Sequence, residues 1–351
     1  MASAPVPLRR RGVHHGRFRP AARVLLDGAE VEARWDADRP IFLPGLLRAS
    51  VAREGRAIRA TLALFERLRR GASFQDEVGA RLARRHAFAL AGASVDQGDR
   101  REIEKVFVDA RAAARTGGRI AAAQLSAKLS WIAHDPRDGS LRIRFSFGAE
   151  ALRDWQKETR RAPWADRYAR AVFPECRAVE GRLTLVDAIE HLVGRRVRFS
   201  ERIVYSNAPG GGALFHHDDE PWQHGVLFSQ LAGKTAWLAL PKRELARHLA
   251  DFARTRARAS RLRADTPARA LRALAREDDA AVERVLNASP AFTRALVEAG
   301  ALFVLREGDV LLLPNHGPDD TCWHSVFALG ARPSLAHSYG IFARRREAED
   351  A

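Results

Sequence analysis

The apolar positions of this 351-residue chain repeat with a helical period through much of its first half. Apolar side chains recur every three or four residues in four segments: 46–70, 100–129, 149–170 and 184–194. That spacing places them on one face of an amphipathic helix. We therefore expect a mainly helical region over residues 26–195.

One segment inside this region has a different period. After the pair Asp138-Gly139, which favours a hairpin turn, Leu141, Ile143 and Phe145 alternate with polar residues. Alternation of this kind gives a strand with one buried face. The sequence therefore predicts a β-hairpin near 130–147.

Residues 196–345 contain many short strand-like runs separated by glycine and proline. Short strands with frequent turn signals favour a barrel or sandwich over an alternating α/β sheet. A long stretch rich in Ala, Arg and Leu interrupts these runs at 243–300 and is typical of helices. We expect an α+β protein in which the helical N-terminal region precedes a β-barrel with a helical insertion between barrel strands.

The chain is strongly basic, with 59 Lys and Arg against 43 Asp and Glu, a net charge of +16. Arginine is abundant along the whole chain and is concentrated at residues 1–25, which we expect to be a flexible basic tail, and at 254–276. Net charge predicts non-specific attraction to polyanions rather than a function. A nucleic-acid partner is therefore compatible with the sequence but not favoured.

Several protein classes are disfavoured by what the sequence lacks. It has no run of eighteen uncharged apolar residues, so we expect no transmembrane helix. Its first twenty residues lack the apolar stretch of a secretory signal. Two cysteines, Cys176 and Cys322, are too few for a disulfide framework. We expect a cytoplasmic enzyme or binding protein.

The densest group of metal-ligating side chains is His216-His217-Asp218-Asp219. Alternate residues of a strand point the same way, so either the first and third or the second and fourth share a face. Either pair is an imidazole with a carboxylate, two-thirds of the facial triad that holds Fe(II) and leaves coordination positions open. His324, at the start of a later strand-like run, is the candidate for the remaining histidine.

Four motifs follow one another on predicted strands: H-x-D at 216–218, GVLFSQLAGKTAWLALP at 225–241, GDVLLLP at 308–314 leading to Trp-His at 323–324, and SLAHSYGIF at 334–342. Together they resemble the JmjC-type, cupin-like Fe(II)/2-oxoglutarate-dependent oxygenases, and above all the ribosomal-oxygenase branch. The likeness spans 196–241 and 301–343. It implies a double-stranded β-helix (cupin or jelly-roll) barrel, dioxygenase activity, and Fe(II), 2-oxoglutarate and O2 as cofactors.

The resemblance implies three iron ligands: His216, Asp218 and His324. Counting from Tyr205 on the preceding strand slightly favours the other pair, His217 and Asp219. Alternation permits only one inward pair, and we expect the first.

The resemblance also implies an anchor for the C5 carboxylate of 2-oxoglutarate. The lysine of JmjC proteins would fall at Thr235, with Lys234 one position early and on the opposite face. Arg332 and Ser334 resemble the R-x-S pair of other 2-oxoglutarate oxygenases, and the planar guanidinium suits a carboxylate. We expect Arg332 rather than Lys234. The full predicted cofactor-binding set is Tyr205, Lys234, Thr235, Arg332, Ser334 and Ser338.

The predicted function is hydroxylation of a protein or peptide side chain or of a small metabolite. Trp222, Trp323 and His316 are the candidate substrate-pocket residues, and no catalytic residue is expected beyond the iron ligands. Two alternatives stay open. One is a 2-oxoglutarate-independent metal cupin enzyme, and the other is a non-catalytic protein that binds RNA or ribosomes through its arginine-rich 254–276 face. A homodimer is compatible with the sequence.

Overall fold

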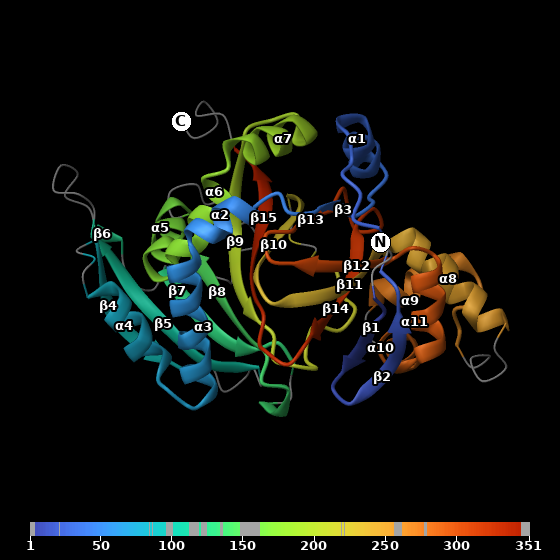
Figure 1. Cartoon of the computed structure of the whole chain (residues 1–351), viewed down its shortest axis with the longest axis horizontal. Coiled ribbons are helices and arrows are strands. Elements are labelled where there is room, and N and C mark those ends of the chain that lie inside the picture. The colour runs from blue at the N-terminus through green and yellow to red at the C-terminus, as the bar shows by residue number, and fades with distance from the viewer. Residues whose placement is uncertain are drawn as a thin grey trace. The chain divides into compact units, whose positions relative to one another are not determined.

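The computed structural model describes residues 4–20, 22–83, 85, 87–95, 101–111, 119–120, 125–133, 136–147, 162–218, 220, 222–255, 262–276 and 279–344. The chain divides into two compact units (Figure 1). The first combines Met1–Leu46 with Pro209–Arg332, and the second combines Leu47–Ala208 with Pro333–Ala351. No helix in the described ranges is long and apolar enough to cross a membrane.

The first unit is built on two sets of antiparallel strands, preceded by helix α1 (Gly28–Asp36). In one set β13 (Val310–Pro314) pairs with β3 (Ile41–Leu43) and with β10 (Gln223–Ala232). The other has the order β12-β11-β14, from β11 (Lys234–Pro241), β12 (Leu302–Arg306) and β14 (Cys322–Leu329). Every residue of β13 and β14 is buried, so both faces of these strands are covered.

Helices connect β11 to β12 where the sequence predicts an insertion at 243–300. They are α8 (Lys242–Thr255), α9 (Pro267–Arg276), α10 (Ala280–Ala288) and α11 (Pro290–Glu298). Asp279 and Ser289 accept main-chain N–H groups of the first turns of α10 and α11 and so cap them. Leu249 and Phe292 share one core with Leu238 of β11, which joins the insertion to the sheet.

The N-terminal residues correct one prediction. The basic composition of 1–25 suggests a flexible tail, but β1 (Val6–Arg10) and β2 (Val13–Phe18) form an antiparallel hairpin. Leu8 and Phe18 are buried in the core of the helical insertion, and β1 packs against β14 while β2 packs against α11. Burying each of these side chains is worth roughly 1.5–3 kcal/mol, which outweighs the polar composition of the segment.

The second unit pairs its strands in the order β15-β9-β8-β7-β5-β4, with β6 beside β5. These strands are β4 (Phe88–Ser94), β5 (Glu102–Arg111), β6 (Arg119–Ile120), β7 (Leu125–Trp131), β8 (Leu141–Phe147), β9 (Val197–Ser206) and β15 (Leu335–Ala343). Its helices are α2 (Arg48–Arg53), α3 (Gly55–Arg69), α4 (Phe74–Leu82), α5 (Ala162–Val172), α6 (Arg177–Glu180) and α7 (Leu183–Val193). The predicted helical segments at 46–70 and 184–194 are thus helical, and 149–161 lies outside the described residues.

The helix predicted at 100–129 is wrong, because β5 and β7 pair there as antiparallel strands. Val106, Val108 and Ala110 are fully buried at every second position, which is the period of a strand. β7 and β8 form the hairpin expected near 130–147. The units also differ from the predicted boundary at 195/196, because β9 and β15 pair with each other and belong to the second unit.

Candidate metal centre

A glycine-rich segment runs beside β14 and carries the first predicted ligand. The Ala328 N–H donates to Gly211 O and the Val326 N–H donates to Ala213 O, each at 2.9 Å. Gly212, between these contacts, has a φ of +134°, and a Cβ there would lie 2.1 Å from Val326 O. Glycine is therefore required for this segment to approach β14 so closely.

The two predicted histidine ligands lie at the end of this ladder. His216 and His324 exchange both main-chain hydrogen bonds, at 3.0 and 2.8 Å, so their side chains share one face. Their ring centroids are 4.2 Å apart. Asp218, two residues further on, places Oδ2 3.8 Å from His324 Nε2. One ligand atom of each residue lies within 4.8 Å of the others, a spacing that one metal ion can bridge.

The second histidine of the HHDD motif points elsewhere. The ring of His217 packs edge-on against Trp323, with centroids 5.0 Å apart. Trp323 precedes His324 on β14, so strand alternation sends His217 and Trp323 to the face opposite the His216 ring. Burial lowers the pKa of His217 to about 4, and this imidazole is neutral at pH 7. Asp219 lies outside the described residues. The geometry favours the first register.

The ring nitrogens of the two paired histidines have different partners. His216 Nδ1 lies 2.7 Å from Leu214 O. Because a carbonyl can only accept, this contact assigns the proton to Nδ1 and leaves the Nε2 lone pair for a metal. Burial, together with the neighbouring His216, lowers the pKa of His324 well below its usual value, so its ring is neutral, the form that binds metal. His324 Nδ1 makes no hydrogen bond among the described residues.

A short chain of buried side chains orients the His324 ring. Trp237 stacks on it, with centroids 5.2 Å apart and an interplanar angle of 25°. Trp237 Nε1 donates to Thr235 Oγ1 at 3.0 Å, and the Thr235 hydroxyl donates to Gln230 Oε1 at 2.7 Å. Thr235, predicted to bind cofactor, is thus engaged within the protein. Lys234 is exposed, and strand alternation puts it on the opposite face.

A buried arginine of the N-terminal hairpin, Arg10, hydrogen bonds to the segments that carry His216 and His324. Arg10 is 2 % exposed, and its Nη1 donates to Ala213 O at 2.5 Å and to Ser325 Oγ at 2.9 Å. Its Nη2 donates to Asn287 Oδ1 at 3.1 Å, and the same amide oxygen accepts the Phe215 N–H at 2.8 Å. Ser325 and Phe215 each adjoin a predicted histidine ligand, so Arg10 and Asn287 connect the two segments that carry these histidines.

The remaining predicted cofactor-binding residues are Tyr205, Arg332, Ser334 and Ser338. Arg332 is exposed in the turn after β14. In the second unit, the Ser334 hydroxyl lies 3.3 Å from Asn207 Nδ2, while Tyr205 and Ser338 lie on the paired strands β9 and β15. Arg332 and Lys234 are both exposed, and exposure does not distinguish between them. The assignment of either one as the anchor of a cosubstrate carboxylate stays a prediction.

The three substrate-pocket candidates lie in different surroundings. Trp222 is 66 % exposed. Trp323 is buried in the core between β14 and the helical insertion. His316 Nδ1 lies 2.6 Å from Asp38 Oδ1, and its ring meets Trp35 edge-on. His316 therefore contacts the end of α1 and the loop that follows it.

The donor set fits Fe(II). Two imidazoles and one carboxylate are the ligands of the facial triad, whereas thiolates favour softer metals. The thiol of Cys322, two residues before His324, is directed to Asp38 O at 2.8 Å and takes no part. The Asp218 side chain is 32 % exposed and that of His324 is 4 % exposed, so the site opens on the carboxylate side.

No family model and no curated protein matches the chain. Three solved structures are similar to it. The ribosomal oxygenase YcfD of Escherichia coli is 13 % identical, and the match covers 94 % of this chain and 55 % of that chain with a TM-score of 0.30. YcfD in complex with cobalt and succinic acid is 14 % identical, with coverages of 78 % and 44 % and a TM-score of 0.26, and a 2OG-Fe(II) oxygenase family oxidoreductase of Burkholderia pseudomallei is 12 % identical, with coverages of 94 % and 97 % and a TM-score of 0.34. The chain spans about half the length of the E. coli chains. Its structural neighbours thus include oxygenases of the class that its motifs resemble.

Proposed function

We propose that this protein is an Fe(II)- and 2-oxoglutarate-dependent oxygenase that hydroxylates its substrate. The observation that carries the proposal is the grouping of His216, Asp218 and His324, with ligand atoms within 4.8 Å of one another. A triad of this composition holds one iron and leaves positions for a chelating cosubstrate and O2.

Iron(II), when bound with 2-oxoglutarate and O2, supplies the oxidative chemistry. The contribution of the chain is to fix the ligands before any substrate arrives. The Leu214 carbonyl sets the tautomer of His216, and Trp237 sets the ring plane of His324. Arg10 bonds to the segments that carry both histidines. Such outer contacts typically change metal affinity or activity by about 10–100-fold when they are removed.

The proposal includes the double-stranded β-helix barrel expected over 196–345. The antiparallel strand sets of the first unit, with β13 between β3 and β10 and with the order β12-β11-β14, support it. The proposed substrate is a protein or peptide side chain or a small metabolite. Arg332 or Lys234 is the proposed anchor for 2-oxoglutarate, in a protein proposed to be cytoplasmic.

One observation favours a second candidate, a metal cupin enzyme that does not use 2-oxoglutarate. Arg332 and Lys234, the two cations proposed to bind the cosubstrate carboxylate, are both exposed. An exposed cation binds a carboxylate weakly, because water competes for both partners. The same triad could then bind iron without holding 2-oxoglutarate.

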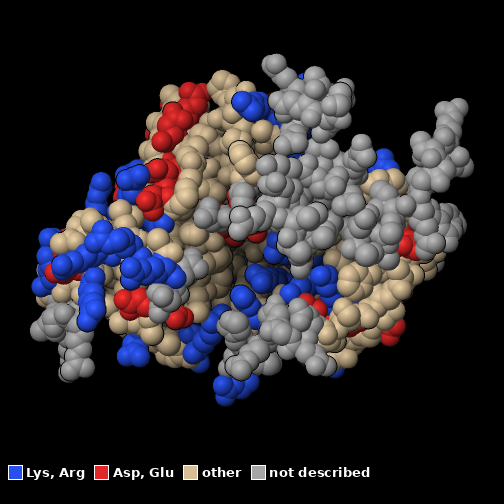
Figure 2. Space-filling view, turned by 180° about the vertical axis from the view of Figure 1, so that it is seen from behind, with Lys and Arg blue, Asp and Glu red and all other residues tan. Residues whose placement is uncertain are grey.

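The arginine-rich face gives little support to the RNA-binding alternative. Arg254 pairs with Asp251, and Arg269 pairs with Asp265, so part of the positive charge is balanced by acidic neighbours in the sequence. Figure 2 shows Lys and Arg side chains gathered at the left of the view, with acidic side chains among them. Residues 256–261 of this face lie outside the described part of the chain.

Anaerobic titration of the metal-stripped protein with Fe(II), followed by 2-oxoglutarate, tests the proposal. The wild-type protein should develop the weak visible charge-transfer band of the iron–2-oxoglutarate chelate. His216→Ala and His324→Ala should lose it. His217→Ala, which removes the neighbouring imidazole on the opposite face, should keep it.

The outcomes separate the candidates. Iron binding without the band would favour the 2-oxoglutarate-independent cupin. A band lost in His217→Ala and kept in His216→Ala would overturn the assigned ligands. Absence of iron binding in the wild-type protein would overturn the enzyme proposal. RNA binding that survives loss of His216 and falls steeply with salt would favour the non-catalytic alternative.

A further inference from the structure

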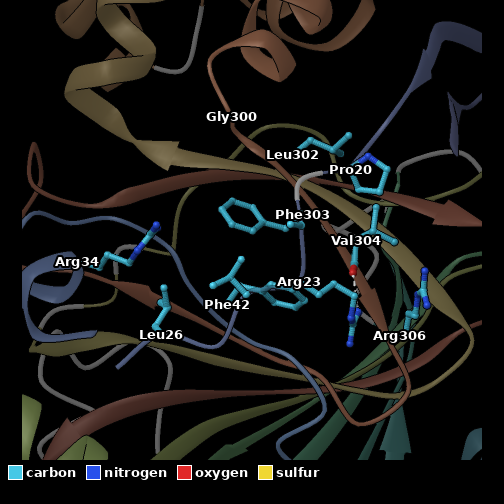
Figure 3. A pocket seen from close by; sticks show the side chains of 12 residues that line it. Pro20, Arg23, Leu26, Arg34, Phe42, Gly300, Leu302, Phe303, Val304 and Arg306 are labelled. Atoms are coloured by element: carbon cyan, nitrogen blue, oxygen red, sulfur yellow. Dashed lines mark hydrogen bonds between the residues drawn. The ribbon is translucent and has the colours of Figure 1, made fainter. Parts of the chain in front are cut away.

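A trough of about 300 Å³ lies in the first unit between β12, β3 and the segment that precedes α1, and no triad residue lines it. Phe42 of β3 and Phe303 of β12 lie at its centre, and Leu26 and Leu302 add further apolar surface (Figure 3). Three arginines also line it: Arg23, Arg34 and Arg306. None of these residues takes part in the proposed iron site.

The first of the three arginines, Arg23, already forms an ion pair within the protein. Arg23 donates to both carboxylate oxygens of Asp309, at 2.5 and 2.6 Å, and its guanidinium lies 5.3 Å from the Phe42 ring centroid. Asp309 is fully buried and also accepts the Gly45 N–H at 2.7 Å. This bidentate pair with a buried carboxylate occupies the Arg23 guanidinium, so we do not assign Arg23 to ligand binding.

The other two arginines, Arg34 and Arg306, have no carboxylate partner in the described part of the chain. Arg34 donates only to the Pro40 carbonyl, at 3.3 Å, and Arg306 is exposed. In the described part of the chain neither lies within ion-pair distance of a carboxylate. Figure 3 shows Arg34 on one side of the Phe42 and Phe303 rings and Arg306 on the other side. The trough therefore has an apolar middle between two separated cations.

The apolar surface continues beyond the cavity. Val24, which lines the trough, is 58 % exposed, and the neighbouring Leu25 is 76 % exposed. A small-molecule site encloses most of its ligand, but these side chains stand in the open next to the cavity. Exposed apolar surface beside charged groups is typical of a protein–protein contact. The surroundings therefore fit a polypeptide better than an enclosed small ligand.

We propose that this arginine-flanked trough is a docking site for an acidic peptide segment of a partner protein, in which apolar side chains lie between acidic ones. The apolar side chains would cover Phe42, Phe303 and Val24. The flanking carboxylates would pair with Arg34 and Arg306. This inference stands apart from the proposed oxygenase activity, because the trough shares no residue with the metal centre.

Fluorescence anisotropy with the full-length protein tests the docking site. The probe is a fluorescein-labelled hexapeptide with a Leu-Phe pair between two pairs of glutamates. The control probe has serines in place of the Leu-Phe pair, so it keeps the charge and measures the general attraction of a chain with net charge +16. The Leu-Phe peptide should bind and the serine peptide should bind at least about fivefold more weakly, because it buries no apolar side chain.

Three variants locate the binding. Arg34→Gln and Arg306→Gln should each lower the affinity for the Leu-Phe peptide by about two- to fivefold, as expected for the loss of a partly exposed ion pair. Leu25→Ser, at an exposed position that leaves the core intact, should also weaken it. The control variants Arg272→Gln and Arg284→Gln remove exposed arginines of α9 and α10 and should bind as the wild-type protein does.

Several results would overturn the inference. They are equal binding of both peptides, equal losses in the trough and control variants, and binding of a fluorescent fatty acid, run as a third probe, with no binding of either peptide. The last would assign the trough to a small anionic amphiphile instead. Circular dichroism of each variant confirms that a loss of binding is not a loss of fold. The iron titration is independent, so failure of one proposal leaves the other standing.

Discussion

The main chains of His216 and His324 hydrogen bond to each other in both directions, at 3.0 and 2.8 Å. The distance between the two imidazoles is therefore set by strand pairing, a rigid relationship, and does not depend on a flexible loop. Asp218 follows His216 by two residues and so returns to the same side of the chain. This single pairing brings together the three predicted ligands, although His324 is far from the other two in the sequence.

Gly212 should be the residue of the ligand segment least tolerant of substitution. A Cβ at this position would lie 2.1 Å from Val326 O, so Gly212→Ala must push the segment away from β14. We expect a loss of roughly 2–4 kcal/mol in the free energy of unfolding, measured in urea. Co(II) affinity should fall as well, because the displaced segment carries His216.

Gly210→Ala is the matched control for that substitution. Gly210 also has a positive φ, +73°, but a Cβ there would meet open space. Only the left-handed backbone would then be penalised, at about 1–2 kcal/mol. Equal effects of the two substitutions would show that contact with Val326 does not decide the need for glycine.

Arg10 should behave as a buried structural residue and not as part of a basic tail. Arg10→Gln removes hydrogen bonds to Ala213 O and Ser325 Oγ and leaves those buried groups without a charged donor. We expect a loss of about 2–4 kcal/mol in the free energy of unfolding and weaker Co(II) binding. Arg9→Gln, at the exposed neighbouring position, should change stability by less than about 0.5 kcal/mol. Equal effects of the two substitutions would show that the hydrogen bonds of Arg10 do not stabilise the segment that carries His216.

Arg10 also shows where sequence reasoning reaches its limit. Its partners Ala213, Asn287 and Ser325 lie 203 to 315 residues away along the chain, and two of its hydrogen bonds go to main-chain oxygens. Contacts with residues so far along the chain leave no motif near residue 10. Arg10 therefore cannot be distinguished from Arg9 in the sequence. Only its partners, which tertiary structure brings to it, make it different.

The candidate site was more accessible to prediction, for a physical reason. His216, Asp218 and His324 each lie on extended segments whose residues alternate between faces, so i and i+2 can be paired from the sequence. Alternation is masked at 100–129, where other apolar residues flank the buried Val106, Val108 and Ala110 and imitate a helical period. The period of a strand is hard to read where apolar residues occupy both faces and easy to read where polar residues mark one of them.

Trp237 should affect the metal site through its ring rather than through its hydrogen bond. Trp237→Phe keeps an aromatic ring against His324 and loses only the N–H donated to Thr235, so we expect a cost of about 1 kcal/mol. Trp237→Ala removes the ring and should cost about 3–5 kcal/mol. In the Co(II)-substituted protein the visible d–d spectrum should change in the alanine variant and stay close to wild type in the phenylalanine variant. An unchanged spectrum in both would show that Trp237 does not orient His324.

A second buried histidine lies in the other unit and has no part in the proposed site. His337 Nε2 lies 3.4 Å from Glu175 Oε1, and its Nδ1 lies 3.5 Å from Cys176 Sγ and 3.2 Å from the Tyr339 hydroxyl. Burial alone would lower the pKa of His337, but Cys176 and Glu175 outweigh it and raise this pKa to about 10. The imidazolium is therefore the form that the folded protein favours.

This raised pKa predicts how stability depends on pH. The unfolded histidine has a pKa near 6.5, so the folded state binds the proton more tightly and its contribution is fully present below about pH 6.5. The contribution is lost as pH rises from about 6.5 to about 10, at a slope of up to about 1.4 kcal/mol per pH unit. Urea unfolding across this range should show the decline in the wild-type protein and in His14→Gln, which changes an exposed histidine. His337→Gln should flatten it between about pH 6.5 and 8.5, below the range in which thiols ionise, and Glu175→Gln should reduce the decline without removing it, because Cys176 also raises this pKa. A flat profile in the wild-type protein would contradict the buried imidazolium, because no other protonation state of this histidine gives stability that decreases over that interval.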